Sequence, residues 1–218
     1  MRSRPFAHGK DTLRANPLGH PVARFIKRLT DILFSLILIL LFSPLMLFAA
    51  IGVRLSSPGP VLFRQERIGL SGRPFTIYKF RSMRVNDKEA SGWTTAHDRR
   101  KTRFGNLLRK TSLDELPQLF NVLRGDMSLV GPRPEMTYFV ERFRQSVPLY
   151  MLKHSVRPGI TGLAQIMGLR GDTSIRRRIR ADIYYIEHWS LFLDIKILIL
   201  TPFRAFNKHE KEPKEETR

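Results

Sequence analysis

The stretch ILILLFSPLMLFAAIGV, residues 37–53, is the most apolar part of the chain and decides its architecture. It belongs to a longer apolar run, from Ile32 to Val53, which is long enough as a helix to cover the roughly 30 Å hydrocarbon core of a bilayer. The interruptions of this run are Ser35, Ser43, Pro44 and Gly52. The run predicts a membrane helix, and the competing interpretations are a signal peptide and the buried helix of a soluble protein.

The Ser43-Pro44 pair lies at the centre of this run. Proline removes a backbone hydrogen bond and bends a helix at or just before itself, which leaves two halves of roughly 17 Å, each too short to cross alone. Basic residues flank both ends, with Lys27 and Arg28 before the run and Arg54 after it, and such residues favour the cytoplasmic side. We therefore expect a re-entrant helix broken at Ser43-Pro44. A kinked transmembrane helix remains the alternative.

Composition narrows the class of partner. The chain of 218 residues has a net charge of +19 and no cysteine, so we expect it to be drawn to a polyanion such as an anionic lipid surface, a phosphate-rich substrate or nucleic acid. A membrane-tethered nucleic-acid-binding protein is therefore an alternative function. It is disfavoured because the sequence has no recognised nucleic-acid-binding module.

Changes in composition along the chain predict four segments. Residues 1–22 are polar and basic and are expected to form a flexible or interfacial arm, followed by the re-entrant membrane helix at 23–55. Residues 56–206 are expected to form a cytoplasmic catalytic domain. Residues 207–218, NKHEKEPKEETR, have the composition of a disordered tail.

The catalytic segment has the pattern of an α+β protein that is mainly helical with a small β-hairpin. VLFRQERIG and RPFTIYKFRSM are β-rich runs separated by LSG, which is typical of a hairpin. Helical patterns follow at 104–109, 113–123, 136–145, 175–185 and 190–206. The phosphate-binding patterns of common nucleotide folds, GxxxxGK[ST] and GxGxxG, are absent from the sequence.

The densest cluster of reactive residue types lies in RKTSLDELPQLFNVLRGDMSLVGPRPE, residues 109–135, where Asp114 and Glu115 stand near the start of a predicted helix. Adjacent side chains on a helix diverge by about 100°, so the two carboxylates need different roles. A structural interpretation is that Asp114 caps the helix or that Ser112 and Glu115 form a capping box. A chemical one is that Asp114 binds Mg²⁺ or attacks phosphorus, while Arg109 neutralises the anion.

Four further basic residues are candidates for binding phosphate. Arg133 stands between two prolines in GPRPE and is presented from a stiff loop as a planar fork. Lys79 and Arg81 end the predicted hairpin, and Arg157 precedes a Pro-Gly turn in VRPGITG. The structural alternatives are an ion pair for Arg133 and solvated surface charges for the other three.

Five motifs in one order give the chain a specific resemblance. They are KRLTDILFS followed by SPLML, then GPVLFRQERIGLSGRPFTIYKFRSM, TSLDELPQLFNVLRGDMSLVGPRPE, VRPGITGLAQI and YYIEHWSLFLDIKIL. Over roughly residues 24–203 the chain resembles the bacterial sugar transferases, the monotopic phosphoglycosyl transferases. Members of that family have a re-entrant helix broken at Ser-Pro, which matches Ser43-Pro44.

The resemblance implies an enzyme that transfers a sugar-1-phosphate from a UDP-sugar to undecaprenyl phosphate and releases UMP. Asp114 would be the nucleophile, forming a covalent phosphosugar intermediate, and would also contact Mg²⁺, with Glu115 in an assisting role. Arg109 and Arg133 match family positions that bind donor phosphate or nucleotide. Lys79 and Arg157 also occupy matching motif positions.

The resemblance further implies an enzyme of the bacterial inner membrane, with its catalytic domain on the cytoplasmic face and no nucleic acid as partner. GITGLAQIMGLRGDT followed by WSLFLDIKIL is most similar to members that prime exopolysaccharide synthesis with glucose-1-phosphate. Those members often carry additional N-terminal membrane helices and a further domain, whereas this chain is expected to hold the catalytic part alone. A homo-oligomer and a catalytically inactive scaffold are both compatible with the motifs.

Overall fold

A computed structural model describes residues 16–85, 100–169 and 173–206. Most of the predicted arm at 1–22 and all of the predicted tail at 207–218 lie outside the described residues. The helices are α1 Pro21–Ser56, α2 Arg103–Thr111, α3 Gln118–Arg124, α4 Thr137–Ser146, α5 Leu163–Ile166, α6 Ile175–Glu187 and α7 Leu191–Phe206. The 3-10 helices are η1 Pro17–Gly19, η2 Leu70–Gly72, η3 Leu113–Glu115 and η4 Tyr150–Ser155. The strands are β1 Leu62–Ile68, β2 Pro74–Phe80, β3 Ser128–Val130 and β4 Gly159–Thr161.

The predicted β-hairpin is confirmed. Strands β1 and β2 pair antiparallel from Leu62 opposite Phe80 to Ile68 opposite Pro74, with η2 between them. The buried Asn121 of α3 attaches this hairpin to the helices, since its Nδ2 donates to the Thr76 carbonyl at 2.7 Å and its Oδ1 accepts from the Tyr78 amide at 3.1 Å. This double hydrogen bond fixes α3 beside β2, so that the residues just before α3 lie next to the end of the hairpin.

A second, parallel sheet of two strands was not expected from the sequence. Ser128 of β3 pairs with Gly159 of β4, and Val130 pairs with Thr161. A Cβ on Gly159 would lie 2.1 Å from the Gly131 amide nitrogen, so only glycine allows the two backbones to approach this closely. This pairing anchors the start of the GPRPE loop, which carries Arg133.

The main core lies where α3, β3, α6 and α7 meet. It is built around side chains with almost no exposed surface, including Val122, Met127, Tyr185, Ile186 and Ile197. Each of these helices therefore presents one apolar face inward, as their mixed apolar and charged sequences require.

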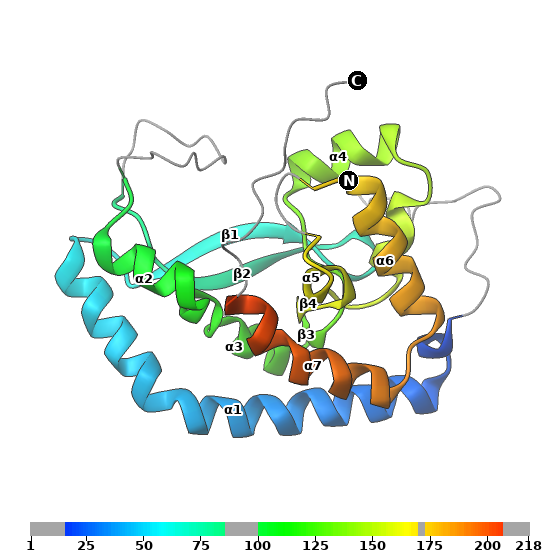
Figure 1. Cartoon of the computed structure of the whole chain (residues 1–218), viewed down its shortest axis with the longest axis horizontal. Coiled ribbons are helices and arrows are strands. Elements are labelled where there is room, and N and C mark those ends of the chain that lie inside the picture. The colour runs from blue at the N-terminus through cyan, green and yellow to red at the C-terminus, as the bar shows by residue number, and fades with distance from the viewer. Residues whose placement is uncertain (1–15, 86–99, 170–172, 207–218) are drawn as a thin grey trace.

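Helix α1 is continuous from Pro21 to Ser56, with Pro44 inside it, so the structure does not show the predicted break. Figure 1 shows the helix bending along its course, with one part running beneath α7 and the other rising toward α2. The Ser43 hydroxyl donates to the Leu40 carbonyl at 2.9 Å, one turn before the proline, which satisfies an acceptor beside the bend. Within the described residues, α1 is the one helix long and apolar enough to cross a membrane, which indicates membrane association.

Both ends of α1 pack against the same body. Near its N-terminal end, Arg28 donates to the carbonyls of Val122 and Leu123 at the end of α3. Near its C-terminal end, Ala49 and Val53 are buried against residues of β2 and α2. The body thus lies along one side of α1 from end to end (Figure 1).

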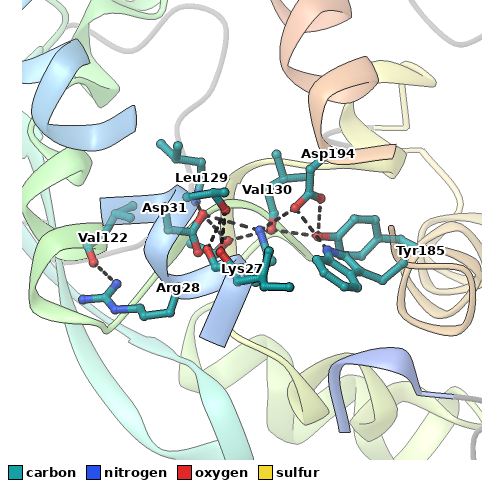
Figure 2. Close-up of polar contacts among 12 residues, drawn as sticks. Lys27, Arg28, Asp31, Val122, Leu129, Val130, Tyr185 and Asp194 are labelled. Atoms are coloured by element: carbon teal, nitrogen blue, oxygen red, sulfur yellow. Dashed lines mark hydrogen bonds and ion pairs between the residues drawn. The ribbon is translucent and has the colours of Figure 1, made fainter. Parts of the chain in front are cut away.

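A buried network of charges also ties α1 to α6, α7 and β3 (Figure 2). Lys27 Nζ lies 2.8 Å from Asp194 Oδ2 and 3.4 Å from Asp31 Oδ1. Asp31 also accepts from the Leu129 amide at 3.1 Å, and Asp194 accepts from the Tyr185 hydroxyl at 2.8 Å. Because buried charges need partners, these contacts specify the position of α1 on the body.

Candidate active site

The Asp114-Glu115 pair lies in η3, between two helices. The predicted helix over 113–123 is therefore wrong in its first part, since α3 begins only at Gln118. The reason is Pro117, which has no backbone N–H and whose ring would clash with a preceding helical turn. The predicted caps are also wrong, because Pro117 is the N-cap of α3 and Ser112 caps η3 without a side-chain hydrogen bond. Neither carboxylate is thus needed to cap a helix.

Glu115 joins three elements through its carboxylate. Its Oε1 accepts from Lys79 Nζ of β2 at 2.8 Å and from Arg133 Nη2 of the GPRPE loop at 3.1 Å. Burial by itself raises the pKa of Glu115, but the positive charges of Arg133 and Lys79 outweigh it and hold this pKa well below its usual range. Glu115 is therefore a carboxylate at neutral pH, and it holds two cations at the site.

Asp114 lies within electrostatic reach of the same arginine. The pKa of Arg133 is raised, first by the Glu115 charge and further by the charges of Glu135 and Asp114, although burial opposes this. Asp114 is partly exposed, and its neighbour Glu115 is directed to Lys79 and Arg133. That the two carboxylates act separately stays a prediction.

The other predicted binding residues take different positions. Arg109 is partly buried in the last turn of α2, just before η3. Arg81 is buried, and its guanidinium donates to the carbonyls of Ser57 and Pro58 at 2.7 and 2.6 Å, where it holds the turn that follows α1. Arg157 donates from Nε to the Gly125 carbonyl at 2.8 Å, at the far end of α3 from Glu115. The structure thus brings Lys79 and Arg133 to the carboxylate pair, whereas a substrate contact by Arg81 or Arg157 stays a prediction.

Two residues that sequence reasoning did not single out line a small polar hollow beside this cluster. The hollow has a volume of about 10 Å³, and its lining consists of Arg67, Ile77, Lys79, Gln118, Arg133 and Pro134. Gln118 stands one turn after Glu115, and Arg67 lies in the hairpin motif RQERIG. Gln118 could have been found from the sequence, because it stands close to the carboxylate pair in the chain. Arg67 could not, because only the fold brings it to the hollow.

An apolar pocket of about 280 Å³ borders Glu115. Leu38 and Phe42 of α1, Leu116 and Leu119 next to Glu115, and Leu198 and Pro202 of α7 are among its lining residues. Helix α1 therefore forms part of the wall of a cavity that borders Glu115. No local pattern predicts this pocket, because its walls come from segments more than 150 residues apart.

A magnesium ion would need substrate oxygens to complete its coordination here. Among the described residues, no three acidic or histidine side chains are grouped closely enough to hold a metal by themselves. One carboxylate together with phosphate oxygens and water is, however, an ordinary ligand set for Mg²⁺. Asp114 with a bound diphosphate fits that set.

Comparisons with known proteins match most of the chain. The profile of the family "Bacterial sugar transferase" matches residues 22–208. The UDP-glucose:undecaprenyl-phosphate glucose-1-phosphate transferase of Escherichia coli K12 is 50% identical over 191 residues, which cover 85% of this chain and 41% of the relative. The UDP-N-acetylgalactosamine-undecaprenyl-phosphate N-acetylgalactosaminephosphotransferase of Aeromonas hydrophila is 50% identical over 198 residues, covering 88% of this chain and 47% of that protein.

A relative of similar length also matches. The exopolysaccharide production protein PSS of Rhizobium leguminosarum bv. phaseoli is 45% identical over 185 residues, which cover 81% of this chain and 92% of the relative. By contrast, this chain spans less than half the length of the Escherichia coli and Aeromonas proteins. These two are equally similar to it, although their names differ in the sugar that is transferred.

Proposed function

The chain belongs to the bacterial sugar transferase family, and on that premise we propose that it transfers a sugar-1-phosphate from a UDP-sugar to undecaprenyl phosphate. The observation that carries the proposal is the Glu115 carboxylate, which borders an apolar pocket and is held by Lys79 and Arg133, two residues that line a polar hollow. A polar, anionic donor and a lipid acceptor require such a boundary. Glucose-1-phosphate is the proposed group, as in the Escherichia coli relative.

Asp114 is the proposed nucleophile. One carboxylate oxygen attacks the phosphorus that carries the sugar, and the bond from that phosphorus to the bridging oxygen breaks, so that UMP leaves with the bond electrons. A phosphate oxygen of the lipid then attacks the same phosphorus and breaks its bond to Asp114. Two steps let a soluble donor and a lipid acceptor use one site in turn.

Lys79 and Arg133 lower the repulsion between Asp114 and an incoming diphosphate. Glu115 positions both cations by accepting their hydrogen bonds. Because its pKa lies well below the usual range, Glu115 is a weak proton acceptor, and we assign it to positioning rather than to proton transfer. Arg109, just before η3, is proposed to contribute further positive charge to donor binding.

Mg²⁺ is the proposed cofactor, held by Asp114 and by the phosphates of the donor. When bound, it neutralises phosphate charge and polarises the phosphoryl oxygens. The residues of the chain still have to supply the nucleophile and the two cations that orient the donor.

The enzyme is proposed to act at the cytoplasmic face of the bacterial inner membrane. Support comes from two helices that expose large apolar side chains. These are α1, with residues such as Phe25, Leu33, Leu40 and Phe48, and α7, with Phe192, Ile195, Ile199 and Phe203 along one face. Both ends of α1 contact the same body, which favours re-entrant insertion over crossing, because a crossing helix would carry one end to the opposite side of the bilayer.

The test is product analysis with purified protein in detergent. Undecaprenyl phosphate, Mg²⁺ and a panel of UDP-sugars are supplied, and UMP is separated from UDP. We expect UMP only when lipid and Mg²⁺ are both present, with UDP-glucose as the preferred donor. Release of UDP would replace the proposal by ordinary glycosyl transfer, and no release with any donor would favour the scaffold or nucleic-acid alternatives.

Asp114→Asn provides the decisive variant. We expect UMP release to fall by roughly a thousandfold or more, because an amide is a poor nucleophile towards phosphorus. Glu141→Gln is the matched control, since Glu141 is exposed on α4 and pairs only with its neighbour Arg144 among the contacts described for it. Substantial activity of the Asp114 variant would remove this residue as the nucleophile.

A further inference from the structure

The polar hollow beside Glu115 presents hydrogen-bond donors. Gln118 is 2% exposed and lines the hollow, and its Nε2 has no hydrogen-bond partner among the described residues. Arg67 lines it too, and its Nε is likewise buried and unpartnered within the described part of the chain. A buried donor without a partner is destabilising, so two such donors on residues that line one hollow indicate that an acceptor binds there.

The charge of the lining limits what the acceptor can be. Arg67, Lys79 and Arg133 are positively charged, and Glu115 is the carboxylate that contacts two of them. Arg67 itself is held by neutral groups, the Gln65 side chain at 2.6 Å and the Pro134 carbonyl at 3.4 Å. Burial and the neighbouring Arg133 charge lower the pKa of Arg67, which is the expected effect of a cation placed near another cation. The hollow therefore suits an anionic oxygen.

The size of the hollow fits one atom of that kind. A volume of about 10 Å³ is close to the space needed by one water-sized oxygen. A phosphoryl oxygen has this size and carries the lone pairs that several converging N–H donors require. A whole sugar or base would not fit.

The position of the hollow separates the two phosphate-bearing substrates. Gln118 and Leu119 are adjacent on α3, and adjacent side chains diverge by about 100°. Gln118 lines the polar hollow, whereas Leu119 lines the apolar pocket whose walls include α1. The apolar side suits the lipid acceptor, which leaves the hollow to the nucleotide donor.

We propose that Gln118 and Arg67 bind a non-bridging phosphate oxygen of the UDP-sugar, with the Gln118 amide and the Arg67 Nε as its donors. The inference rests on the proposed function, because it assigns a part of the same site to the donor. Gln118 and Arg67 are thus donor-binding residues in addition to Lys79 and Arg133.

The experiment measures binding without turnover. UDP is titrated calorimetrically into the full chain in detergent with Mg²⁺, and pyrophosphate is used to compete with it. In Gln118→Met, which keeps the length of the side chain but removes its donor, we expect UDP and pyrophosphate each to bind roughly tenfold more weakly. The KM for the UDP-sugar should rise in parallel, while the KM for undecaprenyl phosphate stays unchanged.

A second variant separates ligand binding from a structural role. Gln118→Glu places a carboxylate beside Arg67 and Lys79. If Gln118 only filled the hollow or held an ordered water, this variant would fold normally and its affinity for UDP would not fall below that of Gln118→Met. A phosphate subsite predicts instead that this variant binds UDP even more weakly than Gln118→Met, because the carboxylate repels phosphate. Gln145→Met, on the exposed surface of α4, is the control and should bind UDP as the wild type does.

Unchanged UDP affinity in both Gln118 variants would overturn the inference and leave the proposed function standing. A change in the KM for undecaprenyl phosphate alone would overturn it too, since the hollow would then serve the acceptor. Weaker UDP binding with unchanged competition by pyrophosphate would likewise exclude a phosphate contact. Failure of the wild type both to bind UDP and to release UMP would instead overturn the proposed function and this inference together.

Discussion

Replacing Lys27 with methionine should destabilise the protein by about 3 kcal/mol. Lys27 is buried and contacts two buried carboxylates, Asp194 at 2.8 Å and Asp31 at 3.4 Å (Figure 2). Methionine keeps the length of the side chain but leaves both carboxylates without their common cation. Removing one partner of a buried ion pair typically costs 3–5 kcal/mol, because the remaining charge is uncompensated.

The lower end of that range is expected because both carboxylates keep other donors. Asp31 retains the Ser128 hydroxyl at 3.0 Å and the Leu129 amide at 3.1 Å. Asp194 retains the Tyr185 hydroxyl at 2.8 Å and the Trp189 indole N–H at 3.1 Å. These hydrogen bonds stabilise the charged carboxylates in part, although they do not neutralise them.

The assay is thermal unfolding of the purified protein, followed by intrinsic fluorescence in one detergent. For a chain of this size about 3 kcal/mol corresponds to a decrease in Tm of roughly 6–12 °C. Lys110→Met is the control, because Lys110 is exposed on α2 and its loss should change stability by no more than about 0.5 kcal/mol.

A double-mutant cycle identifies the cause. Asp194→Asn removes one of the two charges that Lys27 compensates, so the double variant should be more stable than the sum of the single effects by at least about 1 kcal/mol. If the stability effects of the two substitutions were additive, or if the Tm of Lys27→Met lay within 1 °C of the wild type, the charge network would not hold α1 to the body.

Three further predictions concern the donor site, the membrane helix and a buried histidine. Arg133→Lys should raise the KM for the UDP-sugar roughly tenfold, since an ammonium cannot reproduce the forked guanidinium contact, and an equal rise for Arg144→Lys would contradict this role. Replacing Ser43-Pro44 with Ala-Leu should straighten α1 and carry one flank across the membrane, and cysteine labelling that still found both flanks on the cytoplasmic side would refute the role of the pair. Burial and the neighbouring Lys153 lower the pKa of His154 to about 3 from an ordinary value of 6.5. The contribution of neutral His154 to the free energy of unfolding is therefore complete above pH 6.5. It falls by about 2 kcal/mol between pH 7 and pH 5, because only the unfolded chain takes up the proton in this range. The stability of His154→Asn should lose this part of the pH dependence.

Local patterns in the sequence were sufficient for the elements that are long and regular. The two β-rich runs on either side of LSG predicted the hairpin, and the apolar run at 32–53 predicted a long membrane-associated helix. The prediction that Asp114 and Glu115 have separate roles also rests on local geometry. These features depend on spacings within one or two turns, which the order of residues specifies directly.

Short elements and caps could not be predicted in this way. Strands β3 and β4 have three residues each, too few for an alternating pattern, and they pair across about 30 residues of chain. The apolar spacing over 113–123 predicted one helix that runs through Pro117. In the structure the chain forms η3 before this proline, and α3 begins only after it. Whether α1 is re-entrant also depends on the bilayer as much as on the Ser43-Pro44 pair.

The order of residues alone specifies which residue types stand together near Asp114, and it predicts a lipid surface and phosphate chemistry. Which basic residues reach Glu115 depends on the fold. Lys79 and Arg133 do so because Asn121 fixes β2 beside α3 and the β3–β4 pairing anchors the GPRPE loop. Arg81 and Arg157, which looked equivalent in sequence, are instead bound by backbone carbonyls. The reason is physical: the charge of an arginine is a property of the residue, but its partner is set by the course of backbone segments distant in the chain.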